Sequence, residues 1–506
     1  MNIFTTIYRK IREVIGKVIP YKNIESVERV ETTLSTDMIN ALNSWYDLYR
    51  DEPIWKSDTV QTMNLPAFIS SEIARQVVLE MEWNITAKTK DDNGNDSMNP
   101  RAEYLKKEFE RLTLILRQKL EQGCAAGGML IKPYPNTNDG HIYFDWTMDW
   151  AIYPLGFDDD GNLSDVIIPD TFTDGKDIYT RLERHTVDGK NVKITQRAFR
   201  SNSRDSLGKE VPLTAVDRWA SLKPEATVTD SDGTLFGWYK VAAANNIDPD
   251  SPMGASVFSK AVDTIREADK QFSRLLWEFE GSELAVDVDP TALRPRQNGD
   301  GMETAKLSER LFRALDVDKG DRDLYEVFSP SIRDSNLLNG LNQLLIQVED
   351  LVGLSRGTLS NANNEARTAT ELKIMRQRSY TTVSDNQRAL ERCLKDVIRT
   401  MDRYATIYNL APEGEYDVSF NWDDSILTDT EQQMNERLTL QGAGVISKAE
   451  LRQWYFGETA AQAQAAIAEV QKEQVAGMAE LLPTLKDDGT NPPTTNNPAP
   501  PGGNDK

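Results

Sequence analysis

Among the glycine-containing stretches of the sequence, residues 123–130, GCAAGGML, are the most similar to a phosphate-binding loop. Such loops combine free backbone N–H groups with a lysine that reaches the phosphate oxygens. This cluster contains no lysine. We therefore interpret it as the end of a helix whose small residues allow close packing, and the sequence shows no nucleotide-binding loop.

Side chains that could hold a metal or act as a base are sparse. His141 and His185 are the only histidines, and neither has a matching ligand set, so both are predicted to be ordinary sheet residues. The acidic turns at residues 91–96 and 158–162 could hold a divalent cation. Neither has EF-hand spacing, and hairpin turns use Asp and Gly in any case. We expect no catalytic residue, no metal and no cofactor.

The charge of the chain limits what it can bind. Lys and Arg number 58 against 80 Asp and Glu, a net charge of −22. A chain this acidic does not grip nucleic acid by general neutralisation of phosphates. The two distant cysteines, Cys124 and Cys393, predict a reducing compartment without a disulfide framework.

Residues 353–370, GLSRGTLSNANNEARTAT, are small and polar and are predicted to form a long loop. Its only two basic residues are Arg356 and Arg367, and it also holds Asn361, Asn363 and Asn364. A loop of this length is usually either functional or disordered. In the structural alternative, Arg367 pairs with a neighbouring glutamate of the same loop or of the helix that follows.

Two helices must position this loop. Leucines and valines at steps of three and four over residues 337–352 predict a helix that ends at Gly353. After the loop, residues 369–411 contain no Pro or Gly and carry an apolar seam at Leu390, Leu394, Val397, Met401, Tyr404 and Tyr408. This predicts a helix on the order of 60 Å long, which needs other elements or subunits to cover its stripe.

The rest of the chain predicts an α+β fold with segments of different character. Residues 1–19 form an amphipathic pattern that suits a membrane surface or, as its length and the acidic remainder favour, packing on the protein or a partner. With no run of about 18 apolar residues and no secretory signal, we expect no membrane span and synthesis in the cytoplasm. Helices are predicted at 36–47, 66–78, 101–122 and 257–280, a strand at 78–88, and an antiparallel sheet over about 128–223.

An insert of about fifty residues separates the helix at 257–280 from the one that begins at Ser331. LAVDVDP and DLYEVFS predict strands, RPRQNGDG a turn, and ETAKLSERLFRALDV a helix, so we expect a small α/β unit. Beyond the long helix, EYDVSFNWDDSI predicts a strand and residues 429–441, 447–455 and 459–478 predict helices. The proline-rich end, 483–506, is predicted to be disordered.

Two stretches, DPDSPMGASVFSKAVDTIREADKQFSRLLWEFE at 248–280 and EARTATEL at 365–372, resemble the portal proteins of tailed bacteriophages, in particular the siphophage type. The order of elements resembles that family over most of the chain. The resemblance implies an N-terminal amphipathic helix (1–22), an α+β wing (23–255), a stem helix (256–280), an α/β clip (281–329), a second stem helix (330–352), a tunnel loop (353–370), a long wing helix and strand (371–427), a helical crown (428–482) and a disordered tail (483–506).

The resemblance also implies the function and its partners. Portal proteins form a ring, normally of twelve identical subunits, at one capsid vertex of the virion, after assembly in the host cytoplasm. Double-stranded DNA passes through the ring without sequence specificity during packaging and ejection. Terminase and head-completion or adaptor proteins are expected to dock on the clip, at Arg294, Arg296, Asn298 and Asp300, and scaffold and major capsid proteins to meet the wing.

In that setting the tunnel loop would line the narrowest part of the channel. Asn361, Asn363 and Asn364 would offer neutral hydrogen-bonding groups, and Arg356 and Arg367 a few phosphate contacts. The acidity of the chain either repels the DNA backbone from the channel wall or serves solubility only. Two other classes stay open: a metal-dependent nucleic-acid-processing enzyme, and a coiled-coil scaffold or minor capsid component, which would have no use for the insert.

Overall fold

The computed structural model describes residues 21–79, 81–88, 99–136, 138–203, 206–282, 285–288, 294–295, 302–303, 312–314, 325–328, 331–361, 369–422, 430–457 and 459–481. The chain divides into a larger unit that ends at Asp423 and a smaller one that begins at Asp424. The expected tail at 483–506 lies outside the described residues, as does most of the expected N-terminal helix at 1–22. The described chain begins with α2 (Tyr21–Glu28).

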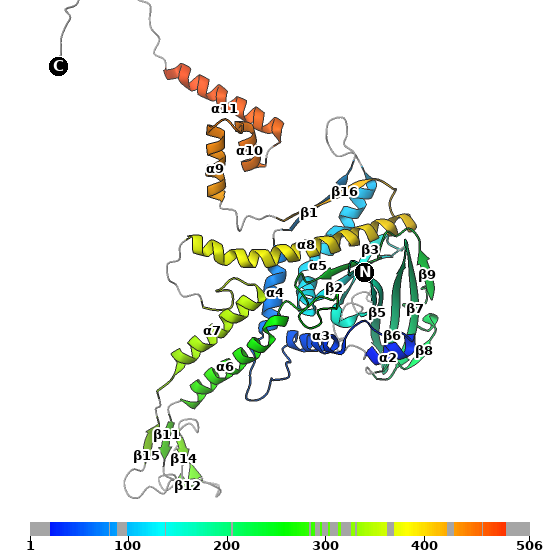
Figure 1. Cartoon of the computed structure of the whole chain (residues 1–506), viewed down its shortest axis with the longest axis vertical. Helices are drawn as coiled ribbons and strands as arrows, with labels where there is room; N and C mark the ends of the chain where they lie inside the picture. Colours follow the sequence, from blue (N-terminus) through cyan, green and yellow to red (C-terminus); the bar gives the residue numbers. More distant parts are fainter. Residues whose placement is uncertain are drawn as a thin grey trace, which may run out of the picture. The chain divides into compact units, whose positions relative to one another are not determined.

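The helix α8 (Ala369–Ile407) spans the larger unit (Figure 1). It contacts α4 (Leu65–Val78), α5 (Pro100–Ala126), β2 (Gly128–Asn136) and β10 (Gly237–Lys240). The predicted seam is confirmed, because its residues are buried from Leu390 to Tyr404. Tyr408 is the exception at 46% exposed, since the helix ends before it and Asn409 turns the chain with a positive φ of 51°.

The small residues at 123–126 form the last turn of helix α5, so the helix ends inside the 123–130 cluster, as predicted, four residues beyond the predicted Gln122. The helix ends at Gly127, whose φ of 90° is the left-handed conformation that glycine adopts readily. A Cβ at Gly127 would lie 2.6 Å from the backbone oxygen of Gly254. These small residues therefore permit close packing at the end of α5, as predicted.

The predicted strands of residues 128–201 are present, but they form two antiparallel sheets where one was expected. β2 lies between β10 and β3 (His141–Met148) in a three-stranded sheet. After a 3₁₀ turn at Asp149–Ala151 the chain enters a six-stranded sheet. Its strands are β4 (Tyr153–Phe157), β5 (Leu163–Asp174), β6 (Asp177–Asp188), β7 (Asn191–Ser201) and β8 (Lys209–Val211), with β9 (Glu225–Val228) also paired to β7. The turn redirects the chain between the sheets.

Further elements complete the body of the larger unit. α3 (Thr36–Tyr49) begins at a Ser35 N-cap. The strand β1 (Met81–Ala87) pairs antiparallel with β16 (Tyr416–Trp422), which joins segments far apart in the sequence. On the inner face of this ribbon, Trp83 and Phe420 make edge contacts with Phe109 of α5.

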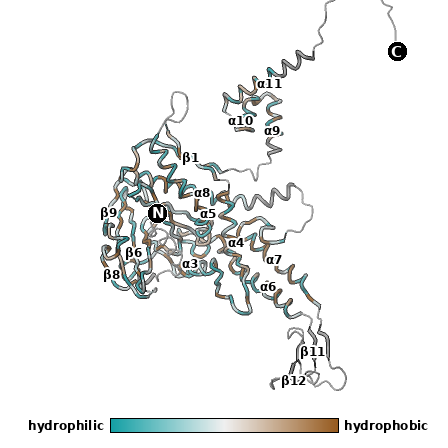
Figure 2. Tube along the Cα trace, turned by 180° about the vertical axis from the view of Figure 1, so that it is seen from behind, coloured by the Kyte–Doolittle hydropathy of each residue, from teal (hydrophilic) through white to brown (hydrophobic). Residues whose placement is uncertain are grey.

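The helices α6 (Val262–Gly281) and α7 (Asp334–Val352) pack side by side and bracket the insert (Figure 1). Both begin a few residues later than predicted, α6 because a 3₁₀ turn at Ser259–Ala261 precedes it. Figure 2 shows hydrophobic residues interspersed with hydrophilic ones along both helices. At the insert end, Arg333 donates to both carboxylate oxygens of Glu278, at 3.1 and 2.8 Å.

The described part of the insert consists of strands. β11 (Ala285–Val288) lies between β14 (Phe312–Ala314), which is parallel to it, and β15 (Tyr325–Phe328), which is antiparallel. β12 (Arg294–Pro295) pairs with β13 (Met302–Glu303). The helix predicted over 303–317 is therefore wrong at β13 and β14. Pairing with β11 gives β14 backbone hydrogen bonds that outweigh local helix propensity.

The smaller unit contains α9 (Thr430–Gly442), α10 (Lys448–Phe456) and α11 (Ala460–Leu481), close to the predicted helices. Ser447 and Glu450 form a capping box at the start of α10. Several apolar side chains of this unit are exposed, namely Leu438, Leu440, Val445, Tyr455, Phe456 and Val470. Across the described residues of both units, no helix is apolar enough over sufficient length to cross a membrane.

Candidate functional site

The first half of the predicted tunnel loop turns back onto the end of α7. Gly353 caps the helix with a φ of 76°, and the N–H of Leu354 donates to the Glu349 carbonyl at 3.0 Å. Leu354 is buried. Residues 353–361 thus leave the helix through an ordered turn.

One buried carboxylate, that of Glu349, organises this turn. Its Oε1 accepts the backbone N–H groups of Gly357 at 3.1 Å, Leu359 at 2.5 Å and Ser360 at 2.9 Å. Its Oε2 accepts the hydroxyl of Ser360 at 2.7 Å. Hydrogen bonds to an ionised acceptor are stronger than neutral ones, so Glu349 holds the turn firmly.

Glu349 was not among the residues predicted from sequence. The signal that could have found it is its place in the buried stripe of α7, between Leu345 and Val352. A charged residue at a buried helix position needs partners. The small residues after Gly353 supply them through their backbone N–H groups.

Two of the predicted channel residues lie in this turn. The Arg356 guanidinium contacts Asp350 through both carboxylate oxygens, at 3.2 and 2.8 Å, and its side chain is 55% exposed. The backbone N–H of Asn361 donates to Asn342 Oδ1 at 2.7 Å. The other three, Asn363, Asn364 and Arg367, lie outside the described residues.

The predicted docking residues of the insert are little described. Arg294 belongs to the short strand β12, while Arg296, Asn298 and Asp300 lie outside the described residues.

The two histidines are sheet residues, as predicted, and each contacts a glutamate. His141 Nδ1 contacts Glu108 Oε1 at 2.7 Å, and His185 Nε2 contacts Glu183 Oε1 at 2.7 Å, each histidine in a strand. Cys124 and Cys393 are free and buried. Within the described ranges, no group of three His, Cys, Asp or Glu side chains could hold a metal ion.

The acidic turn at 158–162 closes on itself. Asp158 Oδ1 accepts the N–H groups of Asp160 at 3.0 Å and Asn162 at 2.7 Å. This is the use of Asp that hairpin turns require. The turn at 91–96 lies outside the described residues.

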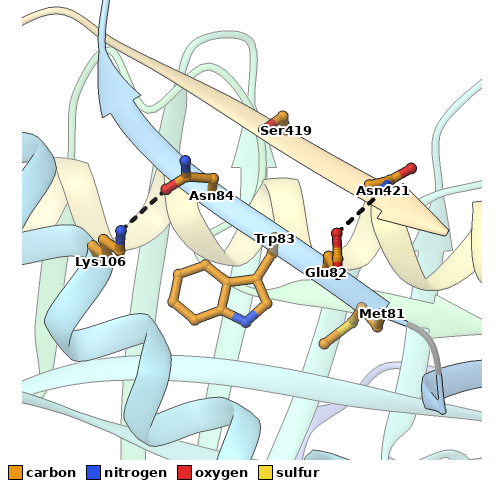
Figure 3. Close-up of a pocket in the computed structure, with 7 residues that line it drawn as sticks. All are labelled: Met81, Glu82, Trp83, Asn84, Lys106, Ser419 and Asn421. Carbon is orange, nitrogen blue, oxygen red and sulfur yellow. Dashed lines mark hydrogen bonds between the residues drawn. The ribbon is translucent and has the colours of Figure 1, made fainter. Parts of the chain in front are cut away.

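A pocket lies at the β1–β16 ribbon and is lined by residues of both faces of the ribbon and by Lys106 of α5 (Figure 3). In it, Lys106 Nζ donates to Asn84 Oδ1 at 3.2 Å, and Asn421 Nδ2 to Glu82 Oε2 at 3.3 Å. Ser419 lies on the neighbouring strand, and no histidine or cysteine joins it among the lining residues. Glu82, the carboxylate of the lining, accepts from Asn421 rather than from Ser419, so no base is placed to activate the Ser419 hydroxyl.

Comparison with known families decides what the chain is. The model of the family described as phage portal protein, SPP1 Gp6-like, matches residues 41–477. The chain belongs to this family. The resemblance found in the sequence is thereby confirmed, and the chain is a phage portal protein that forms the channel for DNA packaging. No curated protein matches the chain closely enough to count as a relative.

Membership in the portal family also fixes the general setting. It implies an oligomeric ring that works with DNA, capsid and terminase at a capsid vertex of the virion. A portal protein has a structural role, which agrees with the expectation that the chain is not an enzyme.

One buried carboxyl of this portal protein responds to pH. Burial raises the pKa of Asp149 to about 7, against the opposing effects of the Trp238 hydrogen bond and the Lys240 charge. Trp238 Nε1 donates to Oδ1 at 3.1 Å, while the buried Oδ2 has no hydrogen-bond partner among the described residues. Between about pH 4 and pH 7 the native protein therefore keeps a proton on Asp149 that the unfolded chain, with a pKa near 3.9, has released.

We expect Asp149→Asn to stabilise the protein above pH 7, by up to about 4 kcal/mol, and to change little below about pH 4. The wild type loses stability between those values because ionisation favours the unfolded chain, whereas the amide stays neutral. Thermal unfolding of both proteins at pH 4 and pH 8 measures the difference. An equal effect of the substitution at both pH values would contradict the assignment.

Proposed function

We propose that the chain forms a twelve-subunit ring through which double-stranded DNA is packaged and later ejected. In this ring α6 and α7 serve as the stem helices, residues 23–255 and 371–427 as the wing, residues 281–329 as the clip, and residues 428–482 as the crown. The observation that carries this proposal is the pair of packed helices that brackets a small sheet and leads into a turn and a very long helix. The family match covers all of these elements.

The ring proposal is supported by apolar surface on the stem helices. Trp277 and Phe279 of α6 and Leu338 of α7 are exposed on the isolated chain. Apolar surface of this kind is often covered in an assembly. Introducing a charged residue, such as aspartate, at these positions is expected to weaken assembly and leave the fold of the subunit intact. Sedimentation measures this, and a protein that stays monomeric at micromolar concentration in every salt would refute the ring.

The clip is proposed to carry the docking surface for terminase and for head-completion or adaptor proteins, through Arg294, Arg296, Asn298 and Asp300. Scaffold and major capsid proteins are proposed to meet the wing. Support comes from the place of the insert at the free ends of α6 and α7, where the Arg333–Glu278 pair joins the two helices.

Deletion of residues 294–301 is expected to lower the affinity for terminase by about tenfold or more, because a few central side chains dominate most interfaces. Ring formation should be unchanged, since the deletion leaves every residue of α6 and α7 in place. Mass photometry of the ring and a binding titration with terminase measure the two effects. Loss of the ring with normal docking would place the interface elsewhere.

Residues 353–370 are proposed to line the narrowest part of the channel. Asn361, Asn363 and Asn364 would offer neutral hydrogen bonds, and Arg356 and Arg367 weak phosphate contacts, too few in each subunit to hold DNA. The Arg356–Asp350 pair supports this, because the carboxylate offsets the charge that a phosphate would meet. Substituting bulky or basic residues at 361–364 should reduce the DNA packaged by rings that still assemble. Normal packaging would refute the channel role.

A further inference from the structure

We propose that Glu349 is a positioning residue of the channel loop, whose carboxylate fixes residues 353–361 on the end of α7 while DNA passes. This inference rests on the proposed channel role of the loop. It adds a residue that itself lies buried in the subunit and acts on DNA only through the loop.

The geometry around Glu349 is specific. Three backbone N–H groups and one hydroxyl, all from residues 357–360, converge on the two oxygens of one fully buried carboxylate. A backbone N–H group is part of the main chain and has no side-chain torsions, so its bond to the carboxylate fixes the path of the main chain itself. If it were removed, the N–H groups of Leu359 and Ser360 would lose their acceptor, and only the Gly357 N–H would keep another, Ser360 Oγ at 3.1 Å. The turn would then open so that these groups reach water.

A second set of contacts fixes both ends of the same turn. At its start, a Cβ on Gly353 would collide with the Thr382 side chain of α8, so the turn begins in contact with the long helix. At its end, Asn342 of α7 binds the backbone of Asn361 through both its amide oxygen and its amide nitrogen, at 2.7 and 3.4 Å. Glu349 lies between these two contacts and holds the middle of the turn.

The consequence for the channel concerns Arg356 and Asn361. Both belong to the turn, so their places relative to α7 and α8 are set by Glu349 and do not depend on the DNA. A loop that yielded to each passing phosphate would present its side chains at variable positions. A loop fixed to two packed helices presents them at constant positions around the ring.

The test uses assembled rings of Glu349→Ala, with Gln347→Ala as the control on the exposed side of the same helix. The rate of trypsin cleavage after Arg356 measures directly how firmly Glu349 holds the turn, because the chain at Arg356 must leave the turn before the protease can cut it. We expect cleavage at Arg356 to become about tenfold faster in Glu349→Ala and to stay at the wild-type rate in the control. Fragment masses identify the site.

The second measurement is the amount of DNA that the same rings package when the ATP-dependent terminase drives them. We expect Glu349→Ala rings to package severalfold less DNA although they assemble and bind terminase normally. A purely structural role of Glu349 would lower assembly or thermal stability and leave packaging per assembled ring unchanged. That result would overturn the proposal.

The isosteric Glu349→Gln is assayed in parallel, because it keeps the shape of the side chain if the alanine variant fails to assemble. It should show intermediate cleavage, since a neutral amide is a weaker acceptor than a carboxylate. A wild-type cleavage rate in every variant that assembles would refute the claim that Glu349 holds the turn. Faster cleavage with normal packaging would refute the positioning role, whereas a ring with the loop on its outer surface would refute the proposed channel function itself.

Discussion

Replacing Arg101 with methionine is expected to lower the free energy of unfolding of the larger unit by about 3–5 kcal/mol. The guanidinium is buried at the start of α5 and donates to the carbonyl oxygens of Asp402 at 2.8 Å, Ala411 at 2.8 Å and Pro412 at 2.9 Å. It also donates to the Asp402 carboxylate at 2.9 Å and the Thr406 hydroxyl at 3.1 Å.

The size of the effect follows from the number of oxygen acceptors that lose their donor when the guanidinium is removed. The Ala411 and Pro412 carbonyls follow the end of α8, where the helix has no further N–H groups to offer, and Asp402 lies near the end of the helix. A methionine side chain fills similar space and donates nothing, so several acceptors lose their partner. Arg101→Lys should fall between, because one ammonium group cannot reach all of these oxygens.

Denaturant unfolding of the two Arg101 variants and of Lys107→Met measures this prediction. Lys107 is exposed on the same helix, so its loss should change stability by less than about 0.5 kcal/mol. An Arg101→Met protein that unfolds at the same denaturant concentration as the Lys107 control would show that the guanidinium contacts do not hold α8 to α5.

The second large effect is expected for Glu183→Gln, at about 3–5 kcal/mol near pH 7. Glu183 lies buried in β6, within 2.7 Å of Lys132 Nζ, 2.7 Å of His185 Nε2 and 3.1 Å of Arg181 Nη2. Removal of its charge leaves Lys132 and Arg181 with only their longer carboxylate contacts, to Asp145 at 3.8 Å and to Asp170 at 3.6 Å. Buried charges that lose their close partner cost far more than a lost surface ion pair.

The stability cost of Glu183→Gln should also depend on pH, which gives a second test of this prediction. Burial alone would raise the pKa of Glu183, but the charges of Lys132 and Arg181 and the contact with His185 lower it well below its ordinary value. A carboxyl with a lowered folded-state pKa stabilises the protein above its unfolded pKa of about 4.3, and this stabilisation is lost as the pH falls further. The cost of Glu183→Gln should therefore be full at pH 7 and shrink below about pH 4.

Glu225→Gln is the matched control, because Glu225 forms an exposed pair with Lys193 at 2.8 Å on the same sheet. Its cost should stay under about 1 kcal/mol. Equal costs for the two substitutions would contradict the buried network.

The long helix and the hairpins were predictable from sequence for a simple reason. Both depend on patterns between near neighbours, such as the steps of four and three from Leu390 to Met401, or the turn at Asp158. The family resemblance also came from local stretches kept in order. What these patterns specify is the type of each element and the face it buries.

Contacts between distant residues were not predictable in this way. Arg101 and Asp402 are 301 positions apart, so no spacing rule connects them. The strand β14 was predicted as a helix because its pairing with β11 is a tertiary effect. Arg356 was found by residue type alone, and its pairing with Asp350 depends on how the turn folds back.

A cryo-EM reconstruction of the purified full-length assembly tests the central claim most directly. We predict a closed ring with a central channel, α6 and α7 around it, and residues 353–361 at its narrowest part, held to α7 by Glu349. A protein that never forms a ring, or a ring in which residues 353–361 lie on the outer surface, would contradict the account.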